Sequence, residues 1–176
     1  MEEIRELISE EKLMERIKQL GEEISRDYAG MEIQLVCILK GGAMFACELA
    51  KRISVPVIMD YMQAASYGES TVSSGNVRLI RDLDMPVRGK HVLIAEDIID
   101  TGNTLAALTE LLCDRGAADI KICTLLDKPA RRIQKKIGAD YCGFSVPDEF
   151  VVGMGLDYDQ KYRNLPYIGI LSFKEA

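Results

Sequence analysis

The sequence predicts an α/β fold in which a central parallel sheet is covered by helices. The run at residues 33–39 is almost continuously apolar, as expected for a strand buried on both faces, and further strands are predicted at 89–95 and 120–126. Segments in which apolar residues recur with helical spacing separate these strands, so that strands and helices alternate along the chain. Such alternation indicates right-handed βαβ units and therefore parallel pairing of the strands.

The N-terminal part of the chain is expected to form an amphipathic helix over about residues 10–28. Ser9 precedes it, and a serine hydroxyl can accept a hydrogen bond from a free amide of the first helical turn. Gly30 stands where a helix commonly stops. The buried face is indicated by apolar residues at spacings of three and four: Leu13, Ile17, Leu20 and Ile24.

The remaining elements follow from the same two patterns and from residues that favour turns. Small polar residues at 64–76 are typical of a loop or long hairpin, and Gly116 ends the last predicted helix. In chain order, we expect a strand at 33–39, a helix at 43–53, strands at 55–62, 77–80 and 89–95, a helix at 104–115, and strands at 120–126, 141–146 and 167–172.

Composition excludes several classes of protein. At 176 residues, the chain is expected to form a single domain, residues 1–176, with its own core. No apolar stretch approaches the roughly 20 residues that span a bilayer, and the acidic N-terminus lacks the apolar region of a signal peptide. We therefore expect a cytoplasmic protein with no membrane partner. A net charge of −6 without a basic stripe argues against nucleic acid as a partner.

The cysteines support the same compartment. They are dispersed, odd in number and placed inside apolar periodic segments, and no Cys-x-x-Cys spacing occurs. This distribution favours buried free thiols over disulfides, a zinc site or a nucleophile. The five residues are Cys37, Cys47, Cys113, Cys123 and Cys142.

Residues 92–105 carry the strongest functional signal. An apolar run ends in the adjacent carboxylates of Glu96 and Asp97, and after two isoleucines Asp100 precedes Thr-Gly-Asn-Thr and a helical pattern. A strand that leads through a loop into a helix N-terminus presents backbone amides, and the helix dipole favours an anion there by roughly 0.3–1 kcal/mol. The pattern predicts a phosphate site at residues 100–104, beside carboxylates suited to sugar hydroxyls or a metal ion.

Charged residues also stand at the C-terminal ends of several predicted strands. In open α/β sheets, ligands bind at these ends. The coincidence is independent of any family pattern, and the residues concerned are Lys40, Glu96, Asp97 and Lys128.

Three motifs in this order resemble the type I phosphoribosyltransferases, and within them the hypoxanthine-guanine branch. They are Glu-Asp-Ile-Ile-Asp-Thr-Gly at 96–102, Leu-Lys-Gly-Gly at 39–42, and the segment 147–167 that begins Pro-Asp-Glu-Phe-Val-Val-Gly. The resemblance covers nearly the whole chain from about residue 9. It implies a central parallel sheet flanked by helices, with a small hood built from the chain ends. The implied parts are a core of about 30–145, a hood from the N-terminal segment and about 146–176, and a lid loop at about 64–76.

The resemblance implies a role for each acid of the central motif. Glu96 and Asp97 would bind the ribose hydroxyls of 5-phosphoribosyl 1-pyrophosphate and take part in binding Mg²⁺. Asp100 would be the general base that takes the proton from purine N7. Considered without the resemblance, Asp100 is equally consistent with an acid that caps the following helix. The residues implied to bind the 5′-phosphate are Asp100, Thr101, Gly102, Asn103 and Thr104.

The pyrophosphate is implied to contact the turn at Lys40 and Gly41 and the side chain of Arg163. In the family, the bond between this lysine and glycine can be cis. Asp157 resembles an acid that binds Mg²⁺ on the pyrophosphate, and it also borders the base. Asp157 and Arg163 are otherwise consistent with surface charges of a short C-terminal helix.

The base is implied to lie between Lys128, Phe150 and the backbone of Val151. A lysine donor matches O6 of hypoxanthine or guanine and would be left unpaired against the amino group of adenine. Without the resemblance, this lysine is an ordinary solvated charge and Phe150 an ordinary core aromatic. Ser66 and Tyr67 are implied to belong to a lid that excludes water.

The implied reaction transfers a phosphoribosyl group from phosphoribosyl pyrophosphate to a 6-oxopurine in a homodimer or homotetramer. Two alternatives are a xanthine-preferring enzyme and a non-catalytic regulator that binds phosphoribosyl pyrophosphate. A regulator would be expected to carry a basic face or a helix-turn-helix segment, and neither is visible. Two residues depart from the usual pattern: Asn103 replaces a larger or basic residue, and Met154 replaces an aromatic one.

Overall fold

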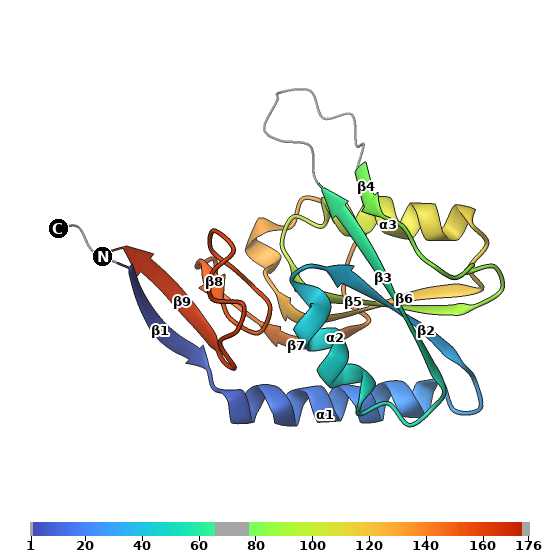
Figure 1. Ribbon diagram of the computed structural model, residues 1–176, viewed down its shortest axis with the longest axis horizontal. Helices are drawn as coiled ribbons and strands as arrows, with labels where there is room; N and C mark the ends of the chain where they lie inside the picture. The colour runs from blue at the N-terminus through green and yellow to red at the C-terminus, as the bar shows by residue number, and fades with distance from the viewer. Residues whose placement is uncertain (1, 66–77, 174–176) are drawn as a thin grey trace.

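A six-stranded sheet forms the centre of the molecule (Figure 1). In sheet order its strands are β4 (Arg78–Arg81), β3 (Val57–Ala65), β2 (Ile33–Leu39), β5 (His91–Ile99), β6 (Asp119–Asp127) and β7 (Tyr141–Ser145). All neighbours pair in parallel except β4, which is antiparallel to β3 at one edge. The computed structural model describes residues 2–65 and 78–173. The predicted fold class, a mostly parallel sheet flanked by helices, is confirmed.

Helices cover both faces of this sheet. Successive residues of a strand point to opposite faces, and in β2 Leu35 and Cys37 join one core cluster while Val36 and Ile38 join the other. The first cluster packs against α1 (Glu10–Asp27) and α2 (Gly42–Ala50), and the second packs against α3 (Asn103–Asp114). This two-sided burial explains why β2, β5 and β6 read as continuous apolar runs rather than as alternating ones.

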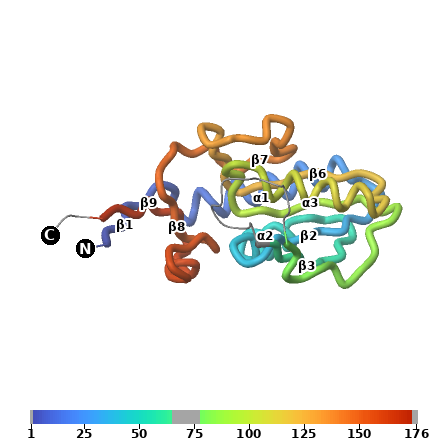
Figure 2. Tube along the Cα trace, turned by 90° about the horizontal axis from the view of Figure 1, so that it is seen from above, coloured from blue at the N-terminus to red at the C-terminus, as the bar shows by residue number. Residues whose placement is uncertain are grey.

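A smaller antiparallel sheet joins the two ends of the chain. It contains β1 (Glu2–Ile8), β9 (Ile168–Phe173) and β8 (Val151–Val152), in that order, and Figures 1 and 2 both place it at one end of the molecule. Glu2 pairs with Phe173, so the first and last described residues are neighbours. The predicted division into a core of about 30–145 and a hood stays a prediction.

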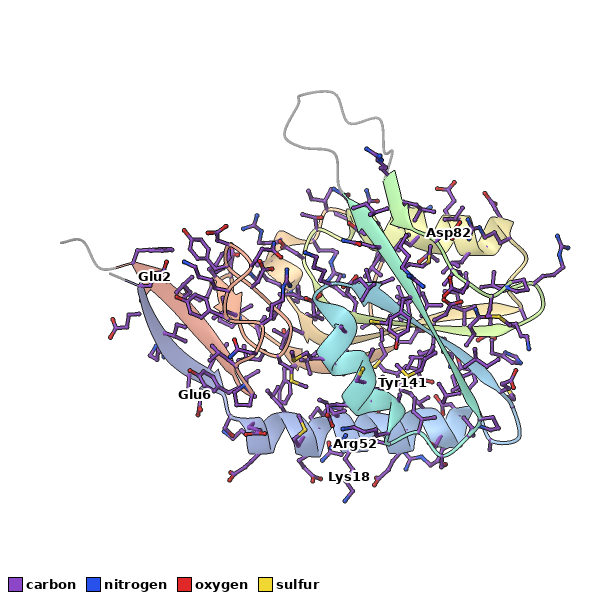
Figure 3. All side chains as sticks on the ribbon, in the orientation of Figure 1. Glu2, Glu6, Lys18, Arg52, Asp82 and Tyr141 are labelled. Carbon is purple, nitrogen blue, oxygen red and sulfur yellow. The ribbon has the colours of Figure 1, made fainter. Side chains whose placement is uncertain are left out.

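The N-terminal helix forms as its spacing predicts. The side chain of Ser9 accepts a hydrogen bond from the amide of Lys12, and the four predicted apolar residues are fully buried. Lys18, on the opposite side of α1, points away from the sheet (Figure 3). In the described part of the chain, no helix combines the length and apolarity needed to cross a membrane.

The helix predicted at 43–53 ends earlier, at Ala50. The amides of Arg52 and Ile53 bond carbonyls three residues back, so the chain leaves the α-helix through a tighter turn. Ile53 is buried nevertheless, which explains why its spacing resembled that of a helix.

The predicted strand 89–95 is wrong at its C-terminal end, because β5 continues to Ile99. Glu96 and Asp97 therefore lie within the strand and not in the loop that follows it. The extension forms because β6 is also long, and its register pairs Glu96 with Thr124 and Ile99 with Asp127. Strands β1 and β8 were not predicted: β1 is rich in glutamate and β8 has two residues.

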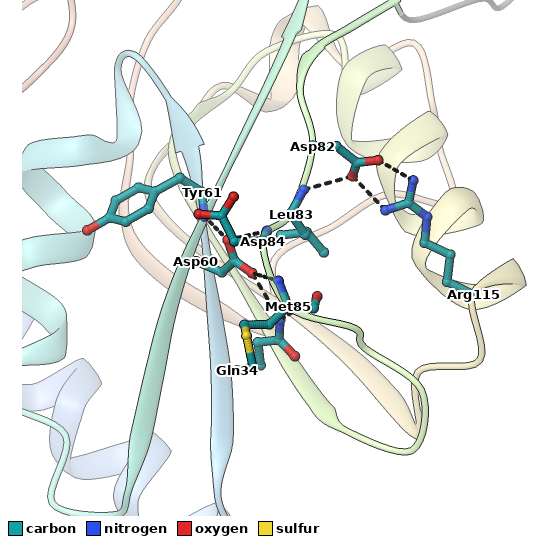
Figure 4. Close-up of polar contacts among 8 residues, drawn as sticks. All are labelled: Gln34, Asp60, Tyr61, Asp82, Leu83, Asp84, Met85 and Arg115. Atoms are coloured by element: carbon teal, nitrogen blue, oxygen red, sulfur yellow. Dashed lines mark hydrogen bonds and ion pairs between the residues drawn. The ribbon is translucent and has the colours of Figure 1, made fainter.

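A buried aspartate fastens the connection between β4 and β5. The carboxylate of Asp60, on β3, accepts hydrogen bonds from the amides of Asp84 and Met85 at 3.1 and 2.9 Å (Figure 4). Beside it, Arg115 at the end of α3 holds Asp82 with two parallel hydrogen bonds of 2.6 and 2.7 Å. These contacts tie the sheet edge to the helix layer.

Candidate active site

A cavity of about 320 Å³ opens at the C-terminal ends of β2 and β5. This is the location at which parallel α/β sheets bind ligands. Most of the predicted phosphate, ribose and pyrophosphate residues line it: Lys40, Gly41, Glu96, Asp97, Asp100, Thr101, Gly102, Thr104, Asp157 and Arg163. The sequence thus identified residues that the fold brings to one cavity from three separate segments.

Two neighbouring carboxylates, Glu96 and Asp97, are buried at the floor of this cavity. Burial raises the pKa of Glu96 well above its usual value, and the adjacent Asp97 raises it further. Burial also raises the pKa of Asp97, although hydrogen bonds from Glu96 and from the Ile98 amide oppose that rise. These shifts favour protonation of the pair, and its carboxyl oxygens provide acceptors for hydroxyl groups or for a cation.

Replacement of Glu96 by glutamine is expected to stabilise the protein more at alkaline than at acidic pH. The folded wild type keeps its proton to a higher pH than the unfolded chain, so its stability is greatest below the unfolded pKa and falls as pH rises through the folded pKa. Glutamine copies the protonated side chain and does not titrate. Thermal unfolding at about pH 5 and about pH 8 measures the difference.

The exposed Glu110 of α3 provides a matched control for that experiment. Glu110→Gln removes the same charge from solvent-exposed surface, and we expect it to leave the pH dependence of the melting temperature unchanged. If Glu96→Gln shifted the melting temperature equally at both pH values, the buried pair would not be the source of the effect.

The loop after β5 presents backbone amides to the cavity. Gly102 has a φ of +83°, which glycine adopts without the strain of a side chain, and it caps α3 with no side-chain hydrogen bond. Among the described residues, the amides of Asp100, Thr101 and Gly102 have no hydrogen-bond acceptor. Free amides at a helix N-terminus suit an anion such as phosphate.

Asp100 lies at the start of this loop and does not cap α3, so the capping alternative is not what the fold shows. Its Oδ1 is sealed from solvent and has no hydrogen bond of good geometry, although Nε of Arg131 lies 3.1 Å away as an ion-pair partner. The side chain as a whole remains 41% exposed. Asp100 lines the cavity, and the exposed part of its carboxylate is available there to accept a proton.

The turn between β2 and α2 approaches the acidic pair very closely. A Cβ on Gly41 would stand 1.7 Å from Oδ2 of Asp97, and a Cβ on Gly155 would stand 1.9 Å from the carbonyl oxygen of Gly41. Glycine is thus required at both positions by lack of space. The cis peptide bond lies between Leu39 and Lys40, one residue before the expected Lys40–Gly41 bond.

Asp157 and Arg163 form an ion pair at the edge of the cavity. Their side chains meet at 2.8 Å, and Nη1 of Arg163 donates to the carbonyl of Gly155 at 2.7 Å. The alternative of a short C-terminal helix is wrong, because the segment consists of turns and isolated bridges, Gly153 with Leu156 and Tyr158 with Lys161.

Of the four predicted base-binding residues, Asp157 lines the cavity, whereas Lys128, Phe150 and Val151 do not. Lys128 is 7% exposed, so it is no solvated charge, and its Nζ donates to the carbonyl of Glu149 at 2.8 Å. Phe150 is 50% exposed, with its ring edge against Tyr158, and so is no core aromatic. The amide of Lys128 bonds the carbonyl of Ile99, which joins this group to the cavity wall.

Val151 of the base group, Asn103 of the phosphate group, the lid residues and Met154 have different outcomes. Val151 is buried in β8, and Asn103 is exposed with its Oδ1 accepting a hydrogen bond from Gln134 at 2.9 Å. Ser66 and Tyr67 lie outside the described residues. Met154 is buried in the core of the molecule.

The donor set of the cavity fits a magnesium ion only if substrate completes it. In residues 2–65 and 78–173, no three His, Cys, Asp or Glu side chains gather as a metal site. Mg²⁺ is commonly bound by one or two carboxylates together with substrate phosphates and water. Glu96, Asp97 and Asp157 supply carboxylates of that kind on two sides of the cavity.

Two arginines near the cavity were missed by the sequence analysis. Arg131 contacts the carboxylates of Asp100 and Asp148, and Arg132 donates to the backbone carbonyls of Ile99 and Asp100. Their only signal in the sequence is a pair of basic residues after Lys128, which resembles ordinary surface charge.

Comparison with known proteins gives a consistent result. A family model described as the phosphoribosyl transferase domain matches residues 4–159. Hypoxanthine-guanine phosphoribosyltransferase of Bacillus subtilis is 52% identical over 94% of this chain and 91% of its own length. The bifunctional protein TilS/HprT of Listeria monocytogenes is 53% identical over the same share of this chain, which spans 25% of that longer protein. A crystal structure of a hypoxanthine phosphoribosyltransferase from Staphylococcus aureus superposes with a TM-score of 0.92 at 48% identity, covering 96% of this chain and 91% of that one.

Proposed function

Because this chain belongs to the phosphoribosyl transferase domain family, we propose that it transfers the phosphoribosyl group of 5-phosphoribosyl 1-pyrophosphate to N9 of hypoxanthine or guanine. The products are IMP or GMP and pyrophosphate. The observation that carries the proposal is the meeting, in one cavity, of free loop amides at 100–102 with the buried acids Glu96 and Asp97. That combination suits a ligand in which a phosphate and a polyhydroxyl sugar are adjacent.

The 5′-phosphate binds the amides of the loop from Asp100 to Thr104, with the hydroxyls of Thr101 and Thr104 as further donors. Asn103 belongs to this loop, although its amide donates to Oγ1 of Thr101 at 3.4 Å and its Oδ1 accepts from Gln134. The ribose hydroxyls donate to Glu96 and Asp97, which lie beside the loop on the cavity floor. These hydrogen bonds hold the sugar with C1′ turned toward the base site.

The pyrophosphate lies between the turn at Lys40 and Gly41 and the guanidinium of Arg163. Lys40 reaches this side of the cavity, where its Nζ donates to Gln160 at 3.2 Å. Asp157, with Glu96 and Asp97, would hold Mg²⁺ on the substrate. The ion supplies charge neutralisation for the leaving pyrophosphate.

The base lies against Phe150 and the backbone of Val151, with Asp157 at its border and Lys128 facing O6. Lys128 is buried, and one of its three N–H donors bonds the carbonyl of Glu149. An additional acceptor near its ammonium group is therefore favourable. Adenine presents a donor at the same position, so the N–H of Lys128 that faces the base would have no acceptor.

Asp100 acts as the general base. The bond between C1′ and the pyrophosphate oxygen breaks, the bond between C1′ and N9 forms, and the proton on purine N7 passes to the Asp100 carboxylate. Pyrophosphate departs with the electron pair of the broken bond. The half-exposed position of Asp100 beside the cavity supports this role.

We also propose where the protein is located in the cell. Free thiols at all five cysteines support a reducing compartment, the cytoplasm. Assembly as a homodimer or homotetramer stays a prediction.

An assay with phosphoribosyl pyrophosphate and Mg²⁺ tests the function. Pyrophosphate release is followed with hypoxanthine, guanine, xanthine and adenine as separate acceptors. We expect turnover with hypoxanthine or guanine and none with adenine. Binding of phosphoribosyl pyrophosphate without turnover of any base would contradict the proposal that the protein is an enzyme and would favour a regulator. Turnover with adenine would contradict the proposed role of Lys128.

A further inference from the structure

Arg132 forms the densest set of polar contacts next to the cavity. Its Nε donates to the carbonyl of Asp100 at 3.1 Å, and its two terminal nitrogens donate to the carbonyls of Ile137 at 2.6 Å and Ile99 at 3.3 Å. The same guanidinium forms an ion pair with Asp127, at the end of β6. Its side chain is 13% exposed, so these contacts are shielded from water.

The contacts fix the direction of the loop amides. In a trans peptide, the carbonyl of one residue and the amide of the next point in opposite directions. Arg132 binds the carbonyls of Ile99 and Asp100, and the carbonyl of Thr101 accepts from the amides of residues 133 and 134, each at 3.0 Å. Three consecutive carbonyls therefore face residues 132–134, and the following amides, of residues 100–102, face the other way, toward the cavity.

We infer that Arg132 is a positioning residue for substrate binding, which orients the amides that receive the 5′-phosphate by holding the carbonyls behind them. The inference rests on the proposed function for the identity of the ligand. Arg132 does not itself line the cavity; it acts through the carbonyls of Ile99 and Asp100, two residues that do.

Arginine is suited to this task and lysine is not. The guanidinium is a planar group with five N–H donors, so it can bind three carbonyls and a carboxylate at once. Asp127 compensates the buried charge and restrains the plane of the guanidinium. A lysine would keep the charge near Asp127 but could not reach all three carbonyls, and the loop would be free to rotate its peptide planes.

The test compares Arg132→Lys with the wild type in steady-state kinetics. We expect the KM for phosphoribosyl pyrophosphate to rise about tenfold, the equivalent of one charge-assisted hydrogen bond, while the KM for hypoxanthine changes little. A role in stability alone would lower the melting temperature and leave both KM values unchanged, and that outcome would overturn the inference.

Arg115→Lys is the matched control, because Arg115 also makes a close arginine–aspartate pair, with Asp82, away from the cavity (Figure 4). It is expected to lower stability without affecting either KM. If Arg132→Lys does not fold, Asp127→Asn decides the question: it releases the guanidinium from one side and should raise the KM for phosphoribosyl pyrophosphate by a smaller factor. An unchanged KM in that variant would contradict the inference.

Binding measurements distinguish failure of the proposed reaction from failure of the positioning role of Arg132. If the wild type turns over no purine, calorimetry with phosphoribosyl pyrophosphate and Mg²⁺ still compares wild type with Arg132→Lys. Weaker binding by the variant supports the positioning role although the reaction is different. Equal binding by both proteins overturns it.

Discussion

Replacement of Asp100 by asparagine is expected to lower kcat by roughly 10²–10⁴-fold, the usual contribution of general acid–base catalysis. Asparagine keeps the size of the side chain and one oxygen, but it cannot take a proton from the purine. The loop amides belong to the backbone, so the KM for phosphoribosyl pyrophosphate should change little. Steady-state kinetics with hypoxanthine, at saturating concentrations of both substrates, measure the effect.

Replacement of a nearby aspartate, Asp148, distinguishes loss of the general base from loss of an ion pair with Arg131. Asp148 also lies near Arg131, at 3.7 Å, and near Nζ of Lys128, at 3.9 Å, and it is 53% exposed. Asp148→Asn removes a carboxylate from the same arginine, and its effect on kcat should be less than about fivefold because exposed ion pairs contribute little. A kcat for Asp100→Asn within about tenfold of the wild type would argue against its role as general base.

Replacement of Gly41 by alanine is expected to lower kcat/KM for phosphoribosyl pyrophosphate by about 10²-fold or more, the cost of a displacement of about 1 Å at a reacting site. The new methyl carbon would lie 1.7 Å from Oδ2 and 2.6 Å from Cγ of Asp97. Either the buried carboxylate or the turn that faces the pyrophosphate must move, and both line the cavity. The carbonyl of Gly41 is also enclosed, because Gly155 approaches it from the other side.

Backbone strain does not contribute to this prediction. Gly41 has φ −59° and ψ −44°, a helical conformation in which alanine is favoured over glycine. The loss therefore comes from the clash alone. Gly138→Ala is the matched control, since a Cβ there meets nothing within 4 Å, and its activity should equal that of the wild type. Wild-type kcat/KM in Gly41→Ala would show that the turn can yield without displacing the carboxylate.

Much of the central fold was predictable because its signals are local. A strand buried on both faces needs a continuous apolar run, and a helix packed on one side needs apolar residues at spacings of three and four. For this reason β2 and α1 form almost where the pattern indicated. Boundaries were less predictable: α2 ends early in a tighter turn, and β5 extends by pairing with β6, a partner that lies outside any local window.

The candidate site likewise combines features that have local sequence signals with features that depend on distant partners. The acids at 96, 97 and 100 and the glycine at 102 stand close together in the sequence, so their place at one cavity could be predicted from one segment. The roles of Arg131 and Arg132 could not, because a pair of basic residues has the same appearance on a solvated surface. Only the folded chain shows that Arg132 is shielded and bound to Asp127.

By itself, the sequence determined the α/β class, the strands and helices of the core, and the residues that approach one edge of the sheet. The tertiary structure decided which of these line the cavity, that glycine at 41 is required by Asp97, and that the chain ends join in a second sheet. The physical reason is range. Periodicity and turn preferences act over a few residues, whereas a clash at 1.7 Å or a shared guanidinium depends on segments that meet only after the core has packed.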